Sequence, residues 1–156
     1  MLTGKNNADA KLTMREFLIM SSKLFTASFS AALASAGTLI LTILTPAANK
    51  GKAIHCRFII DVDKVGAVLI TEGDTVTGGS AVTAYNLNRN SGEAATCTIV
   101  HDGTINPAGT SIKAFFAVPG HNEFEMILKP SIKYSITFTS ATTTTTAIGT
   151  LEFWEE

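Results

Sequence analysis

The amino-acid sequence predicts an all-β protein folded as an antiparallel β-sandwich, and three observations carry this prediction. Charged residues make up only 16% of the 156 residues, and the abundant threonine is β-branched and favours strands over helices. Short segments alternate apolar and polar residues with the period of two that marks a half-buried strand. Turn-forming residues separate these segments about every eight to twelve residues, which is typical of sandwiches and barrels.

Residues 1–22 differ from the rest and are predicted to form an amino-terminal arm or a short helix beside a sandwich domain at 23–156. A helix starting near Asp9 would place Leu12, Glu16 and Ile19 at helical spacing, and an extended arm is the alternative. The segment holds too many apolar side chains for a free tail, so they must pack on this chain or on a neighbour. We predict contacts with other subunits for Leu12, Met14, Phe17, Leu18, Ile19 and Met20.

The first half of the sandwich domain contains four predicted strands. In the first of them, Phe25 and Ala27 alternate with Thr26 and Ser28, as in a strand with one buried face. Residues 34–37 indicate a turn, and Pro46 ends the second strand because proline cannot donate to a sheet ladder. A further turn at 64–66 separates the third strand from the fourth. The four strands are expected at 25–31, 39–44, 58–62 and 67–71.

The second half contains six more predicted strands, interrupted by the glycine pair at 78–79 and by polar loops at 86–92 and 102–109. They are expected at 81–85, 95–100, 112–118, 124–128, 134–139 and 147–154. No long helical segments alternate with the strands, which disfavours a parallel α/β fold. Among β architectures we predict a jelly roll of about eight to ten strands, from the strand number and from a resemblance described below.

The charge balance disfavours two classes of partner. A net charge of −1 leaves no basic excess to neutralise phosphates, so neither nucleic acid nor a membrane surface is an expected partner. The uncharged stretch 24–49 is too polar for a transmembrane helix and is interrupted by Gly37 and Pro46. The polar start lacks the apolar core of a secretory signal, so we expect assembly in a cytoplasm with reduced thiols.

The two cysteines, Cys56 and Cys97, both lie in apolar strand-like segments. The favoured interpretation is a pair of buried free thiols, because buried cysteine behaves as a small apolar residue. A cross-strand disulfide is the second possibility. Metal ligation is the third, since the chain has neither a CxxC motif nor a cluster of cysteine and histidine.

The sequence offers no catalytic motif, and we expect no enzymatic activity. His55, His101 and His121 are scattered along the chain, and a hydrolase would need two of them to converge with an acid in one cleft. The nucleophile elbow, the P-loop, the dinucleotide fingerprint and the zinc-protease motif are all missing from the sequence.

One acidic segment partly matches a calcium-binding loop. Asp61, Asp63 and Glu72 occupy the first, third and twelfth positions of such a loop, and Gly66 occupies the sixth. Val65 stands at the fifth position, where calcium needs an oxygen ligand. We therefore interpret the segment as a β-hairpin with both aspartates on its solvent face, and we expect no metal and no other cofactor.

The polar loop at 86–92 is a possible recognition loop, in which Asn86, Asn88, Arg89 and Asn90 could contact a partner. The alternative is that its amide side chains form turns by bonding to their own backbone. At the carboxyl end, Trp154 between acidic residues could recognise a partner. We favour a final strand in which Trp154 covers one end of the core.

Several features in order along the chain form a further pattern. The most specific are the string Tyr85-Asn86-Leu87-Asn88-Arg89-Asn90-Ser91 and the ending Phe153-Trp154-Glu155-Glu156. They accompany Phe25 and Phe29, Glu72 before Gly78-Gly79, Gly109-Thr110, and the segment 124–130 before Tyr134. Residues 23–156 thereby resemble a group of small tailed-phage virion proteins, similar to auxiliary capsid (decoration or cement) proteins with β-sandwich or jelly-roll folds.

The resemblance implies a place on the surface of a phage head. It implies the major capsid protein as partner and self-association as a homodimer or homotrimer. An alternative is a tail-associated, fibre or spike module that binds a host glycan or receptor. That alternative predicts a cluster of Tyr85, Tyr134 and Trp154 beside the polar loop.

Overall fold

The computed structural model describes residues 13–47, 53–142 and 144–155. A short helix, α1 (Met14–Met20), precedes eight long strands: β1 (Leu24–Leu33), β2 (Thr38–Leu44), β3 (Ile54–Val62), β4 (Gly66–Glu72), β10 (Thr110–Ala117), β11 (Gly120–Leu128), β12 (Lys133–Ser140) and β13 (Thr145–Glu155). Five strands are short: β5 (Val76–Thr77), β6 (Ser80–Ala81), β7 (Tyr85–Asn86), β8 (Thr98–His101) and β9 (Thr104–Ile105). In this part of the chain no helix is long and apolar enough to cross a membrane.

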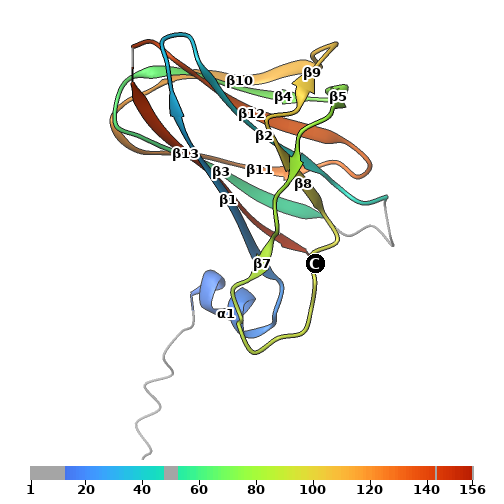
Figure 1. Ribbon diagram of the computed structural model, residues 1–156. Coiled ribbons are helices and arrows are strands. Elements are labelled where there is room, and N and C mark those ends of the chain that lie inside the picture. The colour runs from blue at the N-terminus through green and yellow to red at the C-terminus, as the bar shows by residue number, and fades with distance from the viewer. Residues whose placement is uncertain (1–12, 48–52, 143, 156) are drawn as a thin grey trace, which may run out of the picture.

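The long strands form two antiparallel sheets packed face to face (Figure 1). Sheet A has the order β11-β3-β13-β1-β7, and sheet B has the order β10-β4-β12-β2-β8-β6. Each connection between successive long strands crosses from one sheet to the other, except the one from β4 to β10. Eight strands wound between two sheets in this order make a jelly roll. The predicted all-β sandwich is therefore confirmed, with the short helix as its amino-terminal addition.

The core lies between the two sheets and follows from the alternation in the sequence. Along β3 every second residue is buried, and Phe58 and Ile60 point at the opposite sheet. From sheet B, Tyr134 and Phe138 meet them and are fully buried. Removing such side chains from water contributes about 2–3 kcal/mol each, so the alternating pattern is the main determinant of this fold.

Both cysteines are free and buried, which confirms the favoured prediction for Cys56 and Cys97. Burial raises the pKa of both thiols, because a thiolate would lose its hydration between the sheets. Reactivity of a cysteine requires the thiolate. The two side chains therefore serve as small apolar parts of the core.

Residues 73–109, between β4 and β10, leave the jelly roll and cover its edges. Within them β7 pairs with β1 of sheet A, and β8 and β6 extend sheet B beyond β2. The predicted strand at 81–85 is wrong for this reason. Ala81 pairs with Val100 in sheet B, whereas Tyr85 pairs with Thr26 in sheet A. The chain therefore leaves sheet B after Ala81 and joins sheet A at Tyr85.

The strand predicted at 95–100 begins only at Thr98. Ahead of it, the backbone N–H groups of Thr96 and Cys97 donate to the Glu155 carboxylate at 2.8 and 3.2 Å. A side chain distant in sequence thus replaces the neighbouring strand as their acceptor. The alternation of apolar and polar residues along this segment could not show that a distant carboxylate accepts these two hydrogen bonds.

The acidic segment after β3 joins the two sheets, so the predicted hairpin within one sheet is wrong. Asp63 accepts a hydrogen bond from the backbone N–H of Thr146 at 2.8 Å. Glu72 lies 2.6 Å from the Lys129 ammonium and accepts a hydrogen bond from the buried Tyr134 hydroxyl at 2.9 Å. These acids therefore serve the protein's own contacts at the ends of the strands.

Candidate docking surface

Helix α1 starts at a capping box. The hydroxyl of Thr13 accepts a hydrogen bond from the backbone N–H of Glu16 at 3.2 Å. The Glu16 carboxylate accepts one from the backbone N–H of Thr13 at 2.8 Å, and this bond lowers the pKa of Glu16. The pair satisfies N–H groups that a helix start leaves without partners. The start predicted near Asp9 lies outside the described residues.

Two contacts hold α1 against the outer face of sheet A, the face turned away from the core. Leu18 is 7% exposed and Leu24 is 1% exposed, and both are buried where the helix meets the start of β1. Arg15 of the helix donates to both carboxylate oxygens of Glu152, on the neighbouring strand β13, at 2.8 and 3.3 Å. This hydrogen-bonded pairing raises the pKa of Arg15. A two-pronged guanidinium–carboxylate contact fixes orientation as well as distance.

A third contact comes from the polar loop after β7. The side-chain amide of Asn86 donates to the Ser22 carbonyl at 2.8 Å, and that of Asn88 donates to the Ser22 hydroxyl at 3.0 Å. Ser22 lies in the turn after α1 and has a left-handed backbone, with φ of 61°. The two asparagines therefore clamp the turn that sets the direction of the helix.

The clamped helix presents three apolar side chains to solvent. Met14, Phe17 and Met20 are 69%, 56% and 66% exposed and recur every third residue along one side of the helix. Across sheet A, Ile127 and Trp154 lie in the cross-strand row that ends at the start of β1. We call these five residues the helix-end surface.

The six predicted contact residues have different environments. Met14, Phe17 and Met20 are exposed, as a contact with another subunit requires, and Ile19 is half-buried. The prediction for Leu18 is corrected: this side chain is buried against its own chain and is not available to a neighbour. Leu12 lies outside the described residues.

The predicted recognition loop is mainly a structural clamp. Asn86 is buried, and its side-chain oxygen accepts from the backbone N–H of Asn88 at 2.9 Å; Asn88 accepts in the same way from Asn90 at 3.2 Å. The amides therefore bond to their own backbone, as the alternative interpretation held. Arg89 and Asn90 are exposed, and the Arg89 guanidinium lies 5.1 Å from the ring centre of Tyr85. They are the loop side chains still free to meet a partner.

The clamp leads to a testable prediction. Asn86→Ala should reduce the free energy of unfolding by about 2 kcal/mol, because it leaves buried polar groups without their partners. Asn90→Ala is the matched control: this side chain is exposed, and its change should stay within about 0.5 kcal/mol of zero. Urea unfolding of both variants measures the difference. Equal stability of the two would contradict the clamp.

The three aromatic side chains of the glycan alternative do not form one platform. Tyr134 is buried in the core, and its hydroxyl donates to Glu72. Trp154 lies on the outer face of sheet A, stacked on His55 with ring centres 4.7 Å apart. The favoured final strand is present, but Trp154 covers that outer face and not an end of the core. Only Tyr85 stands beside the polar loop.

A charged cluster occupies the middle of the same outer face. The Arg57 guanidinium lies 3.6–3.8 Å from the carboxylates of Glu123, Glu125 and Glu152. This cluster contains three carboxylates and two guanidinium groups when Arg15, which also contacts Glu152, is included. A partner that covers the helix-end surface would therefore meet an acidic neighbourhood, which favours basic residues at its rim.

His121 lies between two carboxylates at the end of this face. Its Nδ1 is 2.8 Å from Asp61 Oδ1, and its Nε2 is 3.3 Å from Glu123 Oε2. A neutral imidazole can donate from only one nitrogen, whereas the protonated ring donates from both. The hydrogen bond to Asp61 first, and that to Glu123 second, therefore raise the pKa of His121.

The raised pKa predicts a pH dependence. A pKa higher in the folded than in the unfolded chain makes protonated His121 stabilising below about pH 6.5, the ordinary value. This contribution is lost as pH rises through the folded pKa. An NMR titration of the ring should give a midpoint above 6.5, and His121→Gln should remove that part of the pH dependence of the melting temperature. A midpoint at or below the ordinary value would refute the geometry.

The three histidines have separate neighbours. His101 stacks on Phe29 with ring centres 3.6 Å apart, His55 stacks on Trp154, and His121 has its two acids. These settings do not assemble the histidine pair that the hydrolase hypothesis required. Over the described ranges, no group of three or more His, Cys, Asp and Glu side chains could hold a metal ion.

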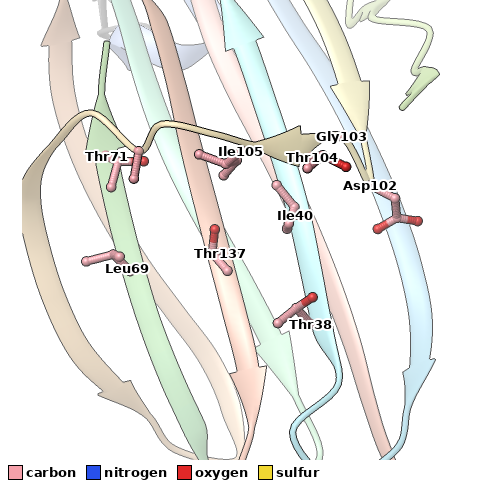
Figure 2. Close-up of a pocket in the computed structure, with 10 residues that line it drawn as sticks. Thr38, Ile40, Leu69, Thr71, Asp102, Gly103, Thr104, Ile105 and Thr137 are labelled. Atoms are coloured by element: carbon pink, nitrogen blue, oxygen red, sulfur yellow. The ribbon is translucent and has the colours of Figure 1, made fainter. Parts of the chain in front are cut away.

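A groove of about 600 Å³ lies on the outer face of sheet B (Figure 2). Figure 2 shows its floor on β2, β4 and β12, and β9 with its flanking residues forms its wall. The lining residues include Ile40, Leu69, Asp102, Ile105 and Thr137. The wall is tied down by Asp74, which accepts hydrogen bonds from the Thr71 hydroxyl and from the backbone N–H of Gly109. Its hydroxyl and aliphatic lining, with one carboxylate, offers no cation to an anionic ligand.

Comparisons with protein-family models, with curated proteins and with solved structures found no match for this chain. The resemblance to auxiliary capsid proteins therefore stays a prediction.

Proposed function

We propose that the chain is a structural, non-enzymatic virion protein that decorates a tailed-phage head and stabilises it by non-covalent binding to the outer shell. The observation that carries the proposal is the helix-end surface. Three contacts from separate parts of the fold hold an apolar helix in one orientation, yet leave Met14, Phe17 and Met20 uncovered. A surface fixed in advance loses little conformational entropy when it binds.

Binding to a shell can draw on the apolar area of this surface and on repeated attachment. Each of the three side chains contributes about 1–2 kcal/mol when covered, at roughly 25 cal/mol per Å² of apolar area. The proposed partner is the major capsid protein, met at many equivalent positions. Self-association as a dimer or trimer adds avidity, because a second attachment becomes intramolecular after the first.

The direct test uses tailed particles assembled without this protein, whose heads are therefore undecorated. Purified full chain is mixed with these particles, unbound chain is removed by sedimentation, and the particles are imaged by electron microscopy. We expect saturable binding and regular density on the outer shell, and added resistance of the heads to heat. Absence from heads, together with density on the tail, would refute the proposal in favour of the fibre or spike alternative.

A further inference from the structure

The two sheets have four edges, and the chain protects three of them. The edges at β7 and β6 are strands of two residues, which offer little main chain to pair with. The edge at β11 carries His121, Glu123 and Glu125 along its outer face. Charged side chains on an edge discourage pairing with another strand.

The fourth edge, β10, has none of these protections over its second half. It is eight residues long and pairs with β4 alone among the described strands, so within that part of the chain the backbone groups on its other side are unpaired. A bulge between Ser111 and Lys113 disturbs only its start. Its one charge, the Lys113 ammonium, lies 5.8 Å from the ring centre of Phe124 on β11, within the same chain. The outward residues that follow, Ala114 and Phe116, are apolar.

Exposed apolar side chains gather at this edge. Phe116 is 76% exposed, more than any other large apolar side chain in the described ranges, and it offers roughly 150 Å². Val65, Leu69, Ile112 and Val118 accompany it, exposed by 36–59%. Stable interfaces bury about 800 Å² per partner, and these side chains with the main chain of β10 would form the apolar centre of such an interface.

We propose that a second copy of this chain pairs with β10 through the same strand, antiparallel and about a two-fold axis near Ala114. Such an edge is its own complement: each Ala114 meets Ala114 of the other copy, and each Phe116 lies opposite the apolar Ile112 of the other β10. Neither strand brings an acid, and Lys113 is turned toward Phe124. Pairing through β11 about Phe124 would instead set Glu123 opposite Glu125 of the other copy, and like charges opposite each other destabilise a sheet.

This inference gives a surface to the self-association in the proposed function and rests on that part of it. Figure 1 shows α1 and β10 at opposite ends of the molecule. A dimer formed through β10 therefore leaves both helix-end surfaces free for the shell. The two proposals can accordingly fail separately.

The test measures mass in solution without any shell. Sedimentation velocity of the full chain under reducing conditions should give twice the 16.5 kDa of one chain. Phe116→Glu should raise the dissociation constant roughly 30-fold or more, while the folded chain still binds heads through α1. The control, Ile148→Glu, changes a residue that is 40% exposed on β13, outside the helix-end surface, and should leave both the dimer and head binding intact.

A cysteine variant tests the register independently of stability. Ala114→Cys, with oxidised glutathione as the oxidant, should form a disulfide between two copies, and Ile148→Cys and the parent chain should not. A monomer at all concentrations, or a dimer unaffected by Phe116→Glu and not cross-linked through position 114, would overturn the proposal.

Discussion

Replacing Met14, Phe17 and Met20 together with glutamine should weaken binding to undecorated heads roughly 100-fold or more. Their exposed area is the apolar part of the helix-end surface that α1 supplies. Glutamine has nearly the helix propensity of methionine, so the helix itself should persist. The side chains that hold the helix, Leu18 and Arg15, are untouched.

A matched control separates docking from general loss of apolar surface. Ile148→Thr removes a side chain that is 40% exposed on the same sheet face, in the cross-strand row of Asp61 and far from the helix. Thermal melting should show the triple variant and the control close to the parent chain. Sedimentation with heads should then separate them. Full binding by a folded triple variant would exclude α1 as the docking surface.

The sequence predicts the sandwich well because alternation is a local property. β3 buries every second residue, and β1 alternates more and less buried residues from Phe25 to Leu33. Each strand's own residues are therefore sufficient to show which face is turned to the core. The jelly-roll order is a choice between sheets, however, and no single strand contains it. Strand number and resemblance led to it, and the strand orders of the two sheets together establish it.

The sequence predicted the apolar residues of the candidate docking surface but not the contacts that orient them. The apolar run at the helix was visible in the sequence, but the contacts that orient it join residues distant along the chain. Arg15 meets Glu152 across 137 positions, and Asn88 meets Ser22 across 66. Asparagines in a polar loop are equally suited to recognition and to turns, so only the fold could show that Asn86 is buried. Leu18 was likewise indistinguishable from Phe17 until the helix was placed.

Gly66→Ala should strongly destabilise this protein, because the added methyl group has no room in the folded chain. Gly66 begins β4, and a Cβ atom there would overlap the ring of Phe138 and the backbone oxygen of Thr139. The ring is fully buried in the core, and the backbone belongs to the neighbouring strand β12, so neither can retreat. We expect a loss of about 3 kcal/mol in the free energy of unfolding, typical of an overpacked core.

Gly92→Ala is the control that isolates the overlap. Nothing lies within 4 Å of a Cβ atom at Gly92, so alanine is accommodated there. Both substitutions reduce the entropy of the unfolded chain to the same extent, which alone would stabilise by about 0.4–1 kcal/mol. The difference between the two variants therefore measures the native contact at Gly66. Calorimetry should place their melting temperatures roughly 6–12 °C apart for a chain of this size. Equal melting temperatures would mean that β4 and β12 do not pack at this distance, and the pairing of sheet B would have to be redrawn.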